Sequence, residues 1–541
     1  NTTSGTAKVT INKKKYYFTP SSDKDLLQTL AGTSAGVITS EDGTLYISFD
    51  VSKLPASVFS YVEVKDPENG YNFVVQEAEP DGNITKKYYK IDWETDKIKI
   101  GTSEAIKWKT ESTGATGSVE VKLPNSDEPK KLYYTVANVE DGPILVTTRL
   151  TDLTGDVGSA TKKVLFKDLK QTSDSHVRGG AINNSFNGNY NIYADFIGNY
   201  VSSKDSDGGA IYNKGTLGNI TGDFIGNYTS SFASSYNYYA KGGAIYNERN
   251  GTIGDITGDF IGNYASSKDG SADGGAIYNY YNSTIGNITG DFIGNYNYAS
   301  SGNVYGGAIH NYYNSTIGNI TGDFIDNYAS SSSSATYEVY GGAIYNYIGT
   351  IGNITGDFIG NYASSGNAYG GAIFNDRALG NITGDFIGNY ASSKSGSAQG
   401  GAVSNHGTIG DITGDFIGNY ASSSYSYSSA GGGAIRNEVS GTIGNITGDF
   451  IGNYVSSYSV YGGAVYNSQT IGDITGDFIG NYASANSENG KAKGGAIYNT
   501  GTLTIAGNST FTDNYVEFNG EKTSNAICNE GTINFNGTNI V

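Results

Sequence analysis

Two short motifs alternate along most of the chain, and they constrain its fold more than any other feature. Gly-Gly-Ala followed by Ile or Val occurs eleven times between Gly179 and Ile497, and Phe-x-x-Asn-Tyr occurs eleven times in phase with it, from Phe196 to Tyr515. Successive Gly-Gly-Ala sites lie 29 to 35 residues apart. A motif that returns at such a period is typical of a solenoid, in which each unit buries its apolar face only against its neighbours.

Each repeat divides into short segments that favour β-strands. The repeat over residues 242–273 contains Ala-Ile-Tyr, Ile-Gly-Asp-Ile-Thr and Asp-Phe-Ile, separated by Gly and Asn. Segments of three to five residues are too short for helices and suit the strands of a parallel β-helix. With about 4.8 Å between stacked strands, eleven coils form a rod on the order of 50 Å long. We therefore predict an all-β fold with a β-helix of about 11 or 12 coils over residues 178–535, followed by a tail at 536–541.

Residues 1–177 differ in kind from the repeats. They hold both Trp residues and most of the Lys, and large and polar side chains alternate in stretches such as 87–93 and 132–136. Alternation of this kind between Gly, Asp and Pro turns indicates strands. We expect an N-terminal β-rich domain or an atypical cap on the solenoid, because an open β-edge invites polymerisation.

Differences between the copies assign residues to the core. The Ile of Gly-Gly-Ala-Ile changes only to Val and the Phe of Phe-x-x-Asn never changes, so both are expected to point inward; the Asn of Phe-x-x-Asn is also retained in all eleven copies. Stacked Phe rings and Asn amides bonded from coil to coil would stabilise the rod. The Gly before this Asn becomes Asp326 or Asp513, which marks a turn. The predicted ladder includes Phe224, Asn227, Phe260, Asn263, Phe292, Asn295, Phe358 and Asn361.

The residue after Gly-Gly-Ala-Ile varies, and we interpret it as facing water. It is Tyr in six copies but also His310, Ser404 and Arg436. Tyr rings on a polar rod make good contacts with sugars or with another protein, so the candidate binding residues are Tyr212, Tyr246, Tyr278, Tyr345, Tyr466 and Tyr498. Five loop tyrosines should also be exposed: Tyr236, Tyr238, Tyr239, Tyr425 and Tyr427. Length variation is concentrated in the loops before Gly-Gly-Ala, which places a row of loops along one side of the rod.

The acidic residues of the rod favour a structural interpretation. The Asp of Thr-Gly-Asp-Phe recurs nine times, as a row of turn acceptors or, less well supported, as a calcium ladder. Enzymes that cut sugar chains use a pair of acids, but nearly every acid of the rod belongs to the repeat or to a loop. His176, His310 and His406 are interpreted as surface substitutions and Cys528 as an inert thiol. We predict no catalytic residues, no metal site and no cofactor.

Charge and composition limit the classes of partner that the rod can bind. Residues 1–177 contain 22 Lys and Arg against 25 Asp and Glu, whereas residues 178–541 contain 12 against 27. An acidic rod repels phosphates, so nucleic acids and anionic lipids are excluded as partners. No apolar run is long enough for a transmembrane helix. One Cys excludes a disulfide framework, and the polar Asn-Thr-Thr-Ser start is expected for a mature N-terminus after signal removal, which favours an extracellular location.

Eleven alternating copies of Gly-Gly-Ala-Ile/Val and Phe-x-x-Asn resemble the polymorphic outer membrane proteins of chlamydiae and related autotransporter passengers. The resemblance covers about 350 of the 541 residues. It implies a right-handed parallel β-helix that is exported to the bacterial cell surface, acts in adhesion and tends to oligomerise.

The residues and the resemblance together predict a non-enzymatic extracellular adhesin. Its loop and Tyr side would bind a protein or glycan on a host or neighbouring cell, and the protein would form a homo-oligomer or homopolymer. The alternative is a subunit of an extracellular fibre that assembles through its termini. A polysaccharide-active β-helix enzyme is the third hypothesis.

Overall fold

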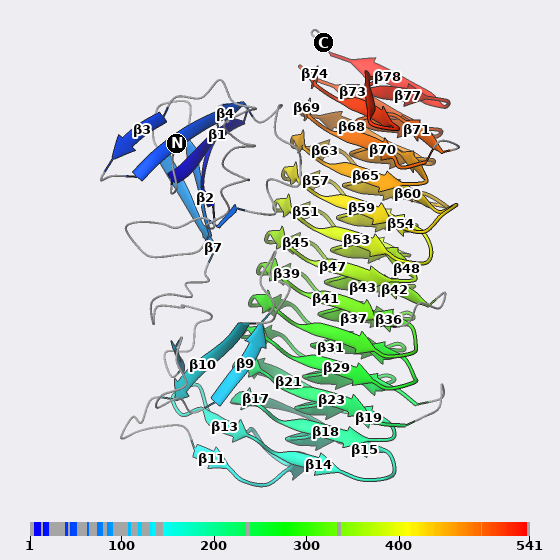
Figure 1. The fold of residues 1–541 in the computed structure, drawn as a ribbon. Coiled ribbons are helices and arrows are strands. Elements are labelled where there is room, and N and C mark those ends of the chain that lie inside the picture. Colours follow the sequence, from blue (N-terminus) through cyan, green and yellow to red (C-terminus); the bar gives the residue numbers. More distant parts are fainter. Residues whose placement is uncertain are drawn as a thin grey trace.

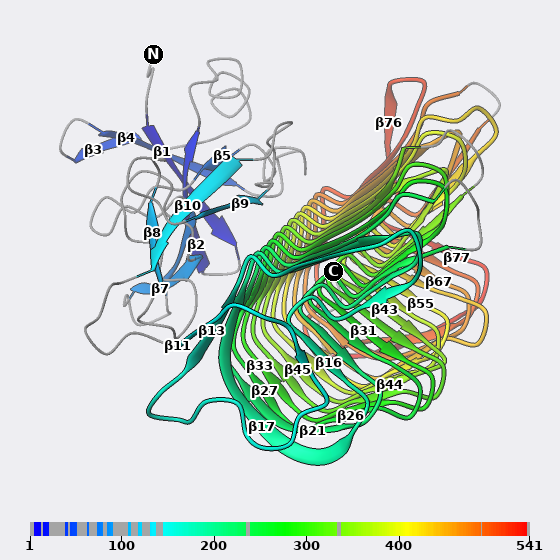
Figure 2. The same cartoon turned by 90° about the horizontal axis from the view of Figure 1, so that it is seen from below.

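The structure is a computed structural model in which residues 144–537 are described apart from 234–237, 333–336 and 488–489, together with the strand backbones between residues 5 and 136. Every regular element described is a β-strand. Residues 144–537 form a stack of parallel coils that rises from the first coil to the C-terminal end (Figure 1), which confirms the predicted β-helix. Seen along the stack, the coils superimpose on one another (Figure 2). Among the described residues, no helix has the length and apolar character needed to cross a membrane.

The strands between residues 5 and 136 confirm that the N-terminal region is rich in β-structure. A five-stranded sheet has the order β3-β4-β1-β2-β5, β6 pairs with β7, and β10 lies between β8 and β9. The strands are β1 (Gly5–Ile11), β2 (Lys14–Pro20), β3 (Ile38–Glu41), β4 (Thr44–Asp50), β5 (Val62–Glu63), β6 (Phe73–Ala78), β7 (Ile84–Tyr89), β8 (Ile106–Lys109), β9 (Gly117–Val121) and β10 (Lys130–Val136).

One coil contributes six short strands to four long sheets. In the coil that starts at Gly242 they are β25 (Ile245–Asn247), β26 (Thr252–Ile253), β27 (Ile256–Thr257), β28 (Phe260–Ile261), β29 (Tyr264–Ser267) and β30 (Ala272–Asp273). The sheets that contain β25 and β29 have 13 strands each, the sheet that contains β30 has 11, and β26 to β28 belong to a sheet of 31. Equivalent residues pair from coil to coil, such as Phe260 with Phe292, so the motif register becomes the register of the stack.

The ladder begins earlier than the motifs indicate. Strand β11 (Ile144–Val146) pairs in parallel with β13 (Val164–Lys167), and β13 pairs with β17 (Asn187–Ile197), which starts the solenoid ahead of the predicted boundary at 177/178. This first coil lacks Gly-Gly-Ala, and Leu169 stands where later coils have the Asn of Phe-x-x-Asn. Its apolar strand β13 is buried nonetheless, so packing extends beyond the motif.

The Phe column forms the centre of the core. Rings from Phe166 to Phe511 stack in twelve successive coils with centroids 4.7 to 5.0 Å apart. Those from Phe166 to Phe478 are fully buried, as are the Ile and Val residues of Gly-Gly-Ala-Ile/Val. Burial of each ring contributes about 2 to 3 kcal/mol, and the offset stacking adds to it.

The predicted Asn ladder is confirmed. The side chain of Asn327 accepts hydrogen bonds from the backbone N–H and from Nδ2 of Asn295, while its own Nδ2 donates to Asn361 Oδ1 at 2.9 Å and to Phe292 O at 2.8 Å. The same bonds recur in successive coils. The ladder residues named from the sequence are all fully buried: Phe224, Asn227, Phe260, Asn263, Phe292, Asn295, Phe358 and Asn361.

A second Asn ladder was missed by the sequence analysis. The Asn that follows Gly-Gly-Ala-Ile-x, such as Asn279, donates from Nδ2 to Asn311 Oδ1 at 2.9 Å and to the backbone oxygen of Thr316. These residues are fully buried in successive coils. The signal was present, because Asn occupies this position in every Gly-Gly-Ala copy.

The Gly-Gly pair is required by backbone geometry. Gly274 has φ of 62°, in the left-handed region that favours Gly. At Gly275 a Cβ atom would lie 2.0 Å from the carbonyl oxygen of Gly307 in the next coil and 2.5 Å from that of Tyr296. Only Gly lets these backbones approach so closely.

The Asp row is capped by backbone groups, as the structural interpretation predicted. Oδ1 of Asp223 accepts a hydrogen bond from the N–H of Asp259 at 3.0 Å, and Asp195 accepts likewise from Asp223. Burial, followed by the charges of Asp195 and Asp259, raises the pKa of Asp223 to about 7. Asp326, in place of Gly, has φ of 54°, which confirms the predicted turn.

Candidate functional site: a tyrosine-lined groove

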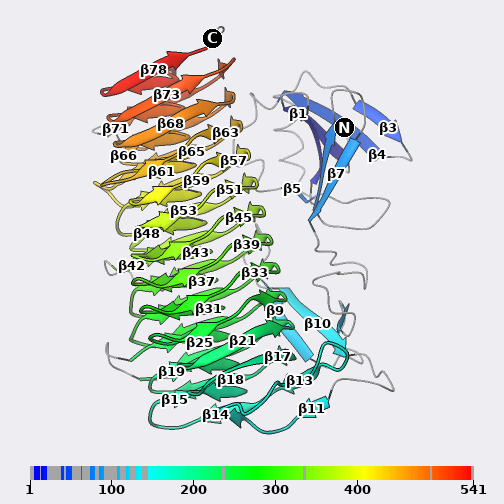
Figure 3. The ribbon, with the colours of Figure 1, turned by 180° about the vertical axis from the view of Figure 1, so that it is seen from behind.

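Three columns of side chains on one side of the rod form a groove. The floor column comes from strands β25, β31 (Ile277–Tyr280), β37 (Ile309–Tyr312) and β43 (Ile344–Tyr347). The first wall comes from β24 (Ala240–Lys241), β30, β36 (Val304–Tyr305) and β42 (Glu338–Tyr340). Figure 3 shows β42 at the rim beside floor strands β37 and β43. Here the floor column denotes Tyr246, Tyr278, His310 and Tyr345; the first wall denotes Lys241, Asp273, Tyr305 and Tyr340; and the second wall denotes Glu248, Tyr280, Tyr312 and Tyr347.

The stacked coils bring the wall rings against the floor rings. On the first wall, Tyr340 stacks on floor residue Tyr345 with centroids 5.1 Å apart. On the second wall, Tyr312 lies edge-on to His310 at 5.5 Å and stacks on Tyr280 at 5.3 Å. The floor is therefore enclosed on both sides by aromatic side chains.

The expectation that the residue after Gly-Gly-Ala-Ile faces water is wrong. Its side chain points away from the core, but in the groove the two walls cover it. Among the six candidate tyrosines, Tyr212 is 1% exposed and Tyr498 is 7% exposed; Tyr246, Tyr278 and Tyr345 lie between these values, and Tyr466 is half-buried. Ser404 and Arg436, whose polarity suggested exposure, are buried too. Polarity at an outward position does not reveal what the neighbouring columns cover.

The groove encloses a cavity of about 790 Å³. It extends over four successive coils, with one floor residue from each. Its lining is Tyr239, Lys241, Tyr246, Glu248, Ser271, Asp273, Tyr278, Tyr280, Asn303, Tyr305, His310, Tyr312, Glu338, Tyr340, Tyr345 and Tyr347. Cavities of this size hold small ligands or a few units of a polymer.

A buried His–Asp pair lies in the middle of the floor. His310 was predicted to be a surface substitution, but it is 2% exposed, so that prediction is wrong. Its Nδ1 lies 3.1 Å from Oδ1 of Asp273, and its ring stacks between Tyr278 at 4.7 Å and Tyr345 at 4.8 Å. Its Nε2 is buried and has no hydrogen-bond partner. No other coil repeats this pair, so the described rod does contain a cluster that breaks the repeat.

The protonation states of the groove follow from burial. Burial lowers the pKa of His310, although its hydrogen bond to Asp273 acts in the opposite direction. The neutral imidazole that results donates from Nδ1 to the carboxylate and leaves a lone pair on Nε2. Burial also raises the pKa of Tyr246, Tyr278 and Tyr345 well above the usual range, so their hydroxyls stay protonated.

A charged cluster lies at the N-terminal end of the groove. His176, Asp205 and Asp207 offer ligand atoms within 4.8 Å of one another, an arrangement that could hold a cation. The ammonium of Lys241, however, lies 3.1 Å from Asp205 and 3.2 Å from Asp207. Burial acts to raise the pKa of Asp207, but the charges and hydrogen bonds of Lys241 and His176 have the larger effect. The pKa of Asp207 is therefore below its usual value. Lys241 thus supplies the positive charge that the two carboxylates require.

A second charged cluster lies further along the same columns. Arg436 Nη2 lies 2.6 Å from Oε2 of Glu438, and its guanidinium lies over the Tyr466 ring at 4.3 Å. Nε2 of His406 lies 3.4 Å from Oε1 of Glu438. The prediction that His406 is a surface substitution therefore missed its contact with this carboxylate. Burial acts to raise the pKa of Glu438, but the hydrogen bonds and charges of His406 and Arg436 have the larger effect. Together they lower the pKa of Glu438 to about 2.

The loop tyrosines lie partly outside the groove. Tyr238, Tyr425 and Tyr427 are exposed, as predicted, whereas Tyr239 is half-buried and lines the cavity. Tyr236 lies outside the described residues. Tyr425 and Tyr427 line a smaller hollow of about 410 Å³ with Tyr458 and Ser487.

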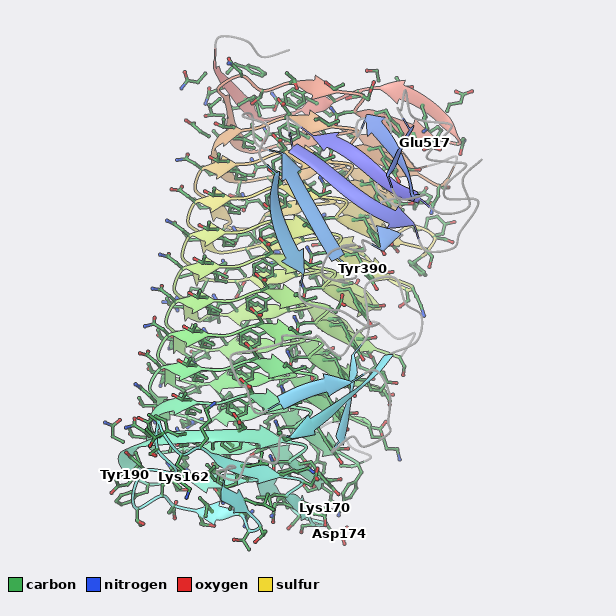
Figure 4. The ribbon with its side chains drawn as sticks, turned by 90° about the vertical axis from the view of Figure 1, so that its left-hand side faces the viewer. Lys162, Lys170, Asp174, Tyr190, Tyr390 and Glu517 are labelled. Atoms are coloured by element: carbon green, nitrogen blue, oxygen red, sulfur yellow. The ribbon has the colours of Figure 1, made fainter. Side chains whose placement is uncertain are left out.

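The Tyr of Phe-x-x-Asn-Tyr forms a separate column. Its rings stack face to face from Tyr200 to Tyr515, with centroids 4.5 to 5.0 Å apart. Figure 4 shows one of them, Tyr390, between Lys170 at the first coil and Glu517 at the last, and nearer to Glu517. The ring faces cover one another, so this column offers mainly edges, whereas the groove combines stacked rings with edge-on pairs such as Tyr312 and His310.

Cys528 occupies the floor position of the last coil, opposite Tyr498, as its place in the degenerate repeat predicted. Its thiol is free.

Comparison with known proteins adds no further assignment. No protein family matches the chain, and no curated protein and no solved structure does so either.

Proposed function

We propose that this protein is a non-enzymatic extracellular surface protein of the adhesin type, and that it binds a glycan chain in the tyrosine-lined groove. The observation that carries the proposal is that the coils differ from one another at the groove columns. In the four coils of the groove the first wall is Lys, Asp, Tyr and Tyr, the second wall is Glu, Tyr, Tyr and Tyr, and the floor is Tyr, Tyr, His and Tyr. Variation of this kind makes each stretch of the groove chemically distinct, as a recognition surface requires.

Exposure alone does not account for this variation. The outward Thr of strand β27 is Thr in nine successive coils, from Thr221 to Thr475, although these side chains are mostly exposed. The repeat is therefore uniform on one outer face and varied on another. The varied face is also the concave and aromatic one, where pyranose rings can stack on Tyr faces and their hydroxyls can bond to phenols.

The test is binding of the full chain to a panel of immobilised and soluble glycans, followed by calorimetry with the best oligosaccharide. Tyr312→Ala removes one residue of the second wall and should weaken binding at least about fivefold, because stacking on one aromatic side chain contributes about 1 kcal/mol or more. Tyr313→Ala is the matched control, since the adjacent Tyr313 stacks on Tyr281 and does not line the cavity. Equal weakening by both variants, or binding to no glycan, would refute the proposal.

A fibre subunit is the second candidate, and the two ends of the solenoid favour it. Leu145 on β11 is 56% exposed and Phe535 on β78 (Thr532–Asn536) is 60% exposed, and these are the first and last strands of the 31-stranded sheet. Stacking of one copy on another would pair these edges and bury both side chains. Electron microscopy over a dilution series tests this: filaments lost in a Leu145→Ser/Phe535→Ser variant support it, and discrete rods at all concentrations refute it.

A further inference from the structure

The chemistry of the groove narrows the ligand further. We infer that the groove binds a glycan whose sugars carry free amines, that is, an oligomer of de-N-acetylated amino sugars. This inference rests on the proposed function and adds the charge of the ligand to it.

The first argument is the balance of charge along the cavity. Three carboxylates line it, those of Glu248, Asp273 and Glu338, against the single ammonium of Lys241. That ammonium is already neutralised by Asp205 and Asp207, which lie outside the lining. The groove thus presents excess negative charge to its ligand, in a chain whose net charge is −18. An amine-bearing ligand would be attracted, and an anionic one repelled.

The second argument is the aromatic lining. Nine Tyr side chains line the cavity. Tyr faces attract cations through the quadrupole of the ring, and the attraction strengthens where water is excluded. The protein makes this contact itself at one end of the groove, where Lys241 Nζ lies 5.8 Å from the Tyr246 ring centroid.

The third argument is the unpartnered imidazole nitrogen in the floor. Nε2 of His310 is buried without a hydrogen-bond partner, and its Nδ1 is engaged by Asp273. A neutral imidazole in this state accepts a hydrogen bond and has none to give at Nε2. A buried acceptor of this kind is costly unless a ligand supplies a donor, and an ammonium or hydroxyl group does so.

Size and shape favour a sugar chain over other cations. A linear polyamine is too thin to fill about 790 Å³. A basic peptide would gain most by adding a strand to a free sheet edge, but the floor strands β31 and β37 are paired on both sides. The four floor residues span roughly 14 Å along the stack, which suits a run of about three pyranose rings.

The experiment is calorimetry of the full chain with three tetrasaccharides at physiological salt: the β-1,4 tetramer of glucosamine, the same tetramer of N-acetylglucosamine, and cellotetraose. The free-amine tetramer should bind about tenfold or more tightly than either neutral tetramer. Glu338→Gln removes one of the three carboxylates that line the cavity and should remove most of that preference. The control Glu521→Gln, on the exposed strand β76 (Glu521–Ser524), should leave the preference unchanged.

Two results overturn the inference in different ways. Equal or tighter binding of the neutral tetramers would refute recognition of the amines and leave glycan binding intact. Tight binding of spermine or oligolysine with no binding of any tetrasaccharide would refute both the inference and the proposed function. His310→Phe provides a second variant, since Phe374 occupies the same position in the coil after that of Tyr345. It should weaken binding of the free-amine tetramer about fivefold or more if Nε2 accepts from the ligand.

Discussion

Replacement of Asp223 by Asn should stabilise the solenoid at neutral and alkaline pH. Asp223 lies in the buried Asp row between Asp195 and Asp259, and its Oδ1 accepts the N–H of Asp259 at 3.0 Å. An Asn side chain keeps this acceptor and removes the charge. The variant therefore isolates the cost of the buried carboxylate from the value of its hydrogen bond.

The sign and size follow from the raised pKa. Burial, with the charges of Asp195 and Asp259, raises the pKa of Asp223 from 3.8 to about 7 in the folded protein. The folded state thus binds a proton more tightly than the unfolded state, so stability is greatest at low pH and falls as pH rises from about 4 to about 7. The full shift corresponds to at most about 4 kcal/mol. Asp223→Asn should gain that amount at pH 8 and no more than about 1 kcal/mol at pH 4.

The assay is urea unfolding at pH 4 and pH 8, followed by circular dichroism. Asp411→Asn is the matched control, because Asp411 accepts a similar bond from Asn445 at 2.7 Å on the exposed side of the coil, where other coils already have Asn. It should change the free energy of unfolding by no more than about 0.5 kcal/mol at either pH. An Asp223→Asn gain that is absent, or equal at both pH values, would contradict the argument and point to a bound cation in the row.

Three further predictions concern the ladder, the Gly pair and the second charged cluster. Asn327→Ala removes four buried hydrogen bonds and should cost about 3 to 5 kcal/mol in urea unfolding; a loss under 1 kcal/mol would show that the ladder is dispensable. Gly275→Ala should lower the melting temperature or abolish soluble expression, whereas Gly155→Ala, with no atom within 4 Å of its Cβ, should be neutral; equal effects would contradict the steric argument. Glu438→Gln should destabilise the protein above about pH 4.5 and progressively less as pH falls toward 2, because the folded pKa of Glu438 is depressed; a pH-independent cost would indicate packing instead.

The repeat determined the fold because a solenoid is local in sequence. Each coil contacts only its neighbours, so a motif that returns at a constant period places Phe on Phe and Asn on Asn without any long-range information. The Phe column, the first Asn ladder and the turn at Asp326 could be read from the copies alone. The first coil could not, because residues 144–178 join the ladder through apolar strand β13 and carry neither motif.

The burial of the candidate site depends on how neighbouring columns of side chains cover one another. The sequence identified the outward Tyr positions, yet it treated each column as facing water independently. Only the coiled backbone shows that the first wall and the second wall cover the floor column from both sides. Burial by neighbouring columns depends on the angles between sheets, which the motif period does not encode.

The pair of His310 and Asp273 shows most clearly the difference between what the sequence predicts and what the tertiary structure adds. The two residues are 37 positions apart: Asp273 ends β30 in the coil that starts at Gly242, and His310 lies on β37 in the coil that starts at Gly306. In the sequence each looks like an isolated substitution in a regular repeat. The chain turns sharply at Gly-Gly, which brings Asp273 beside the floor of the next coil, and the stack then places His310 directly on floor residue Tyr278. The sequence alone thus determined the stack and its core, whereas the tertiary structure decided the groove, its charge and its one unpartnered nitrogen.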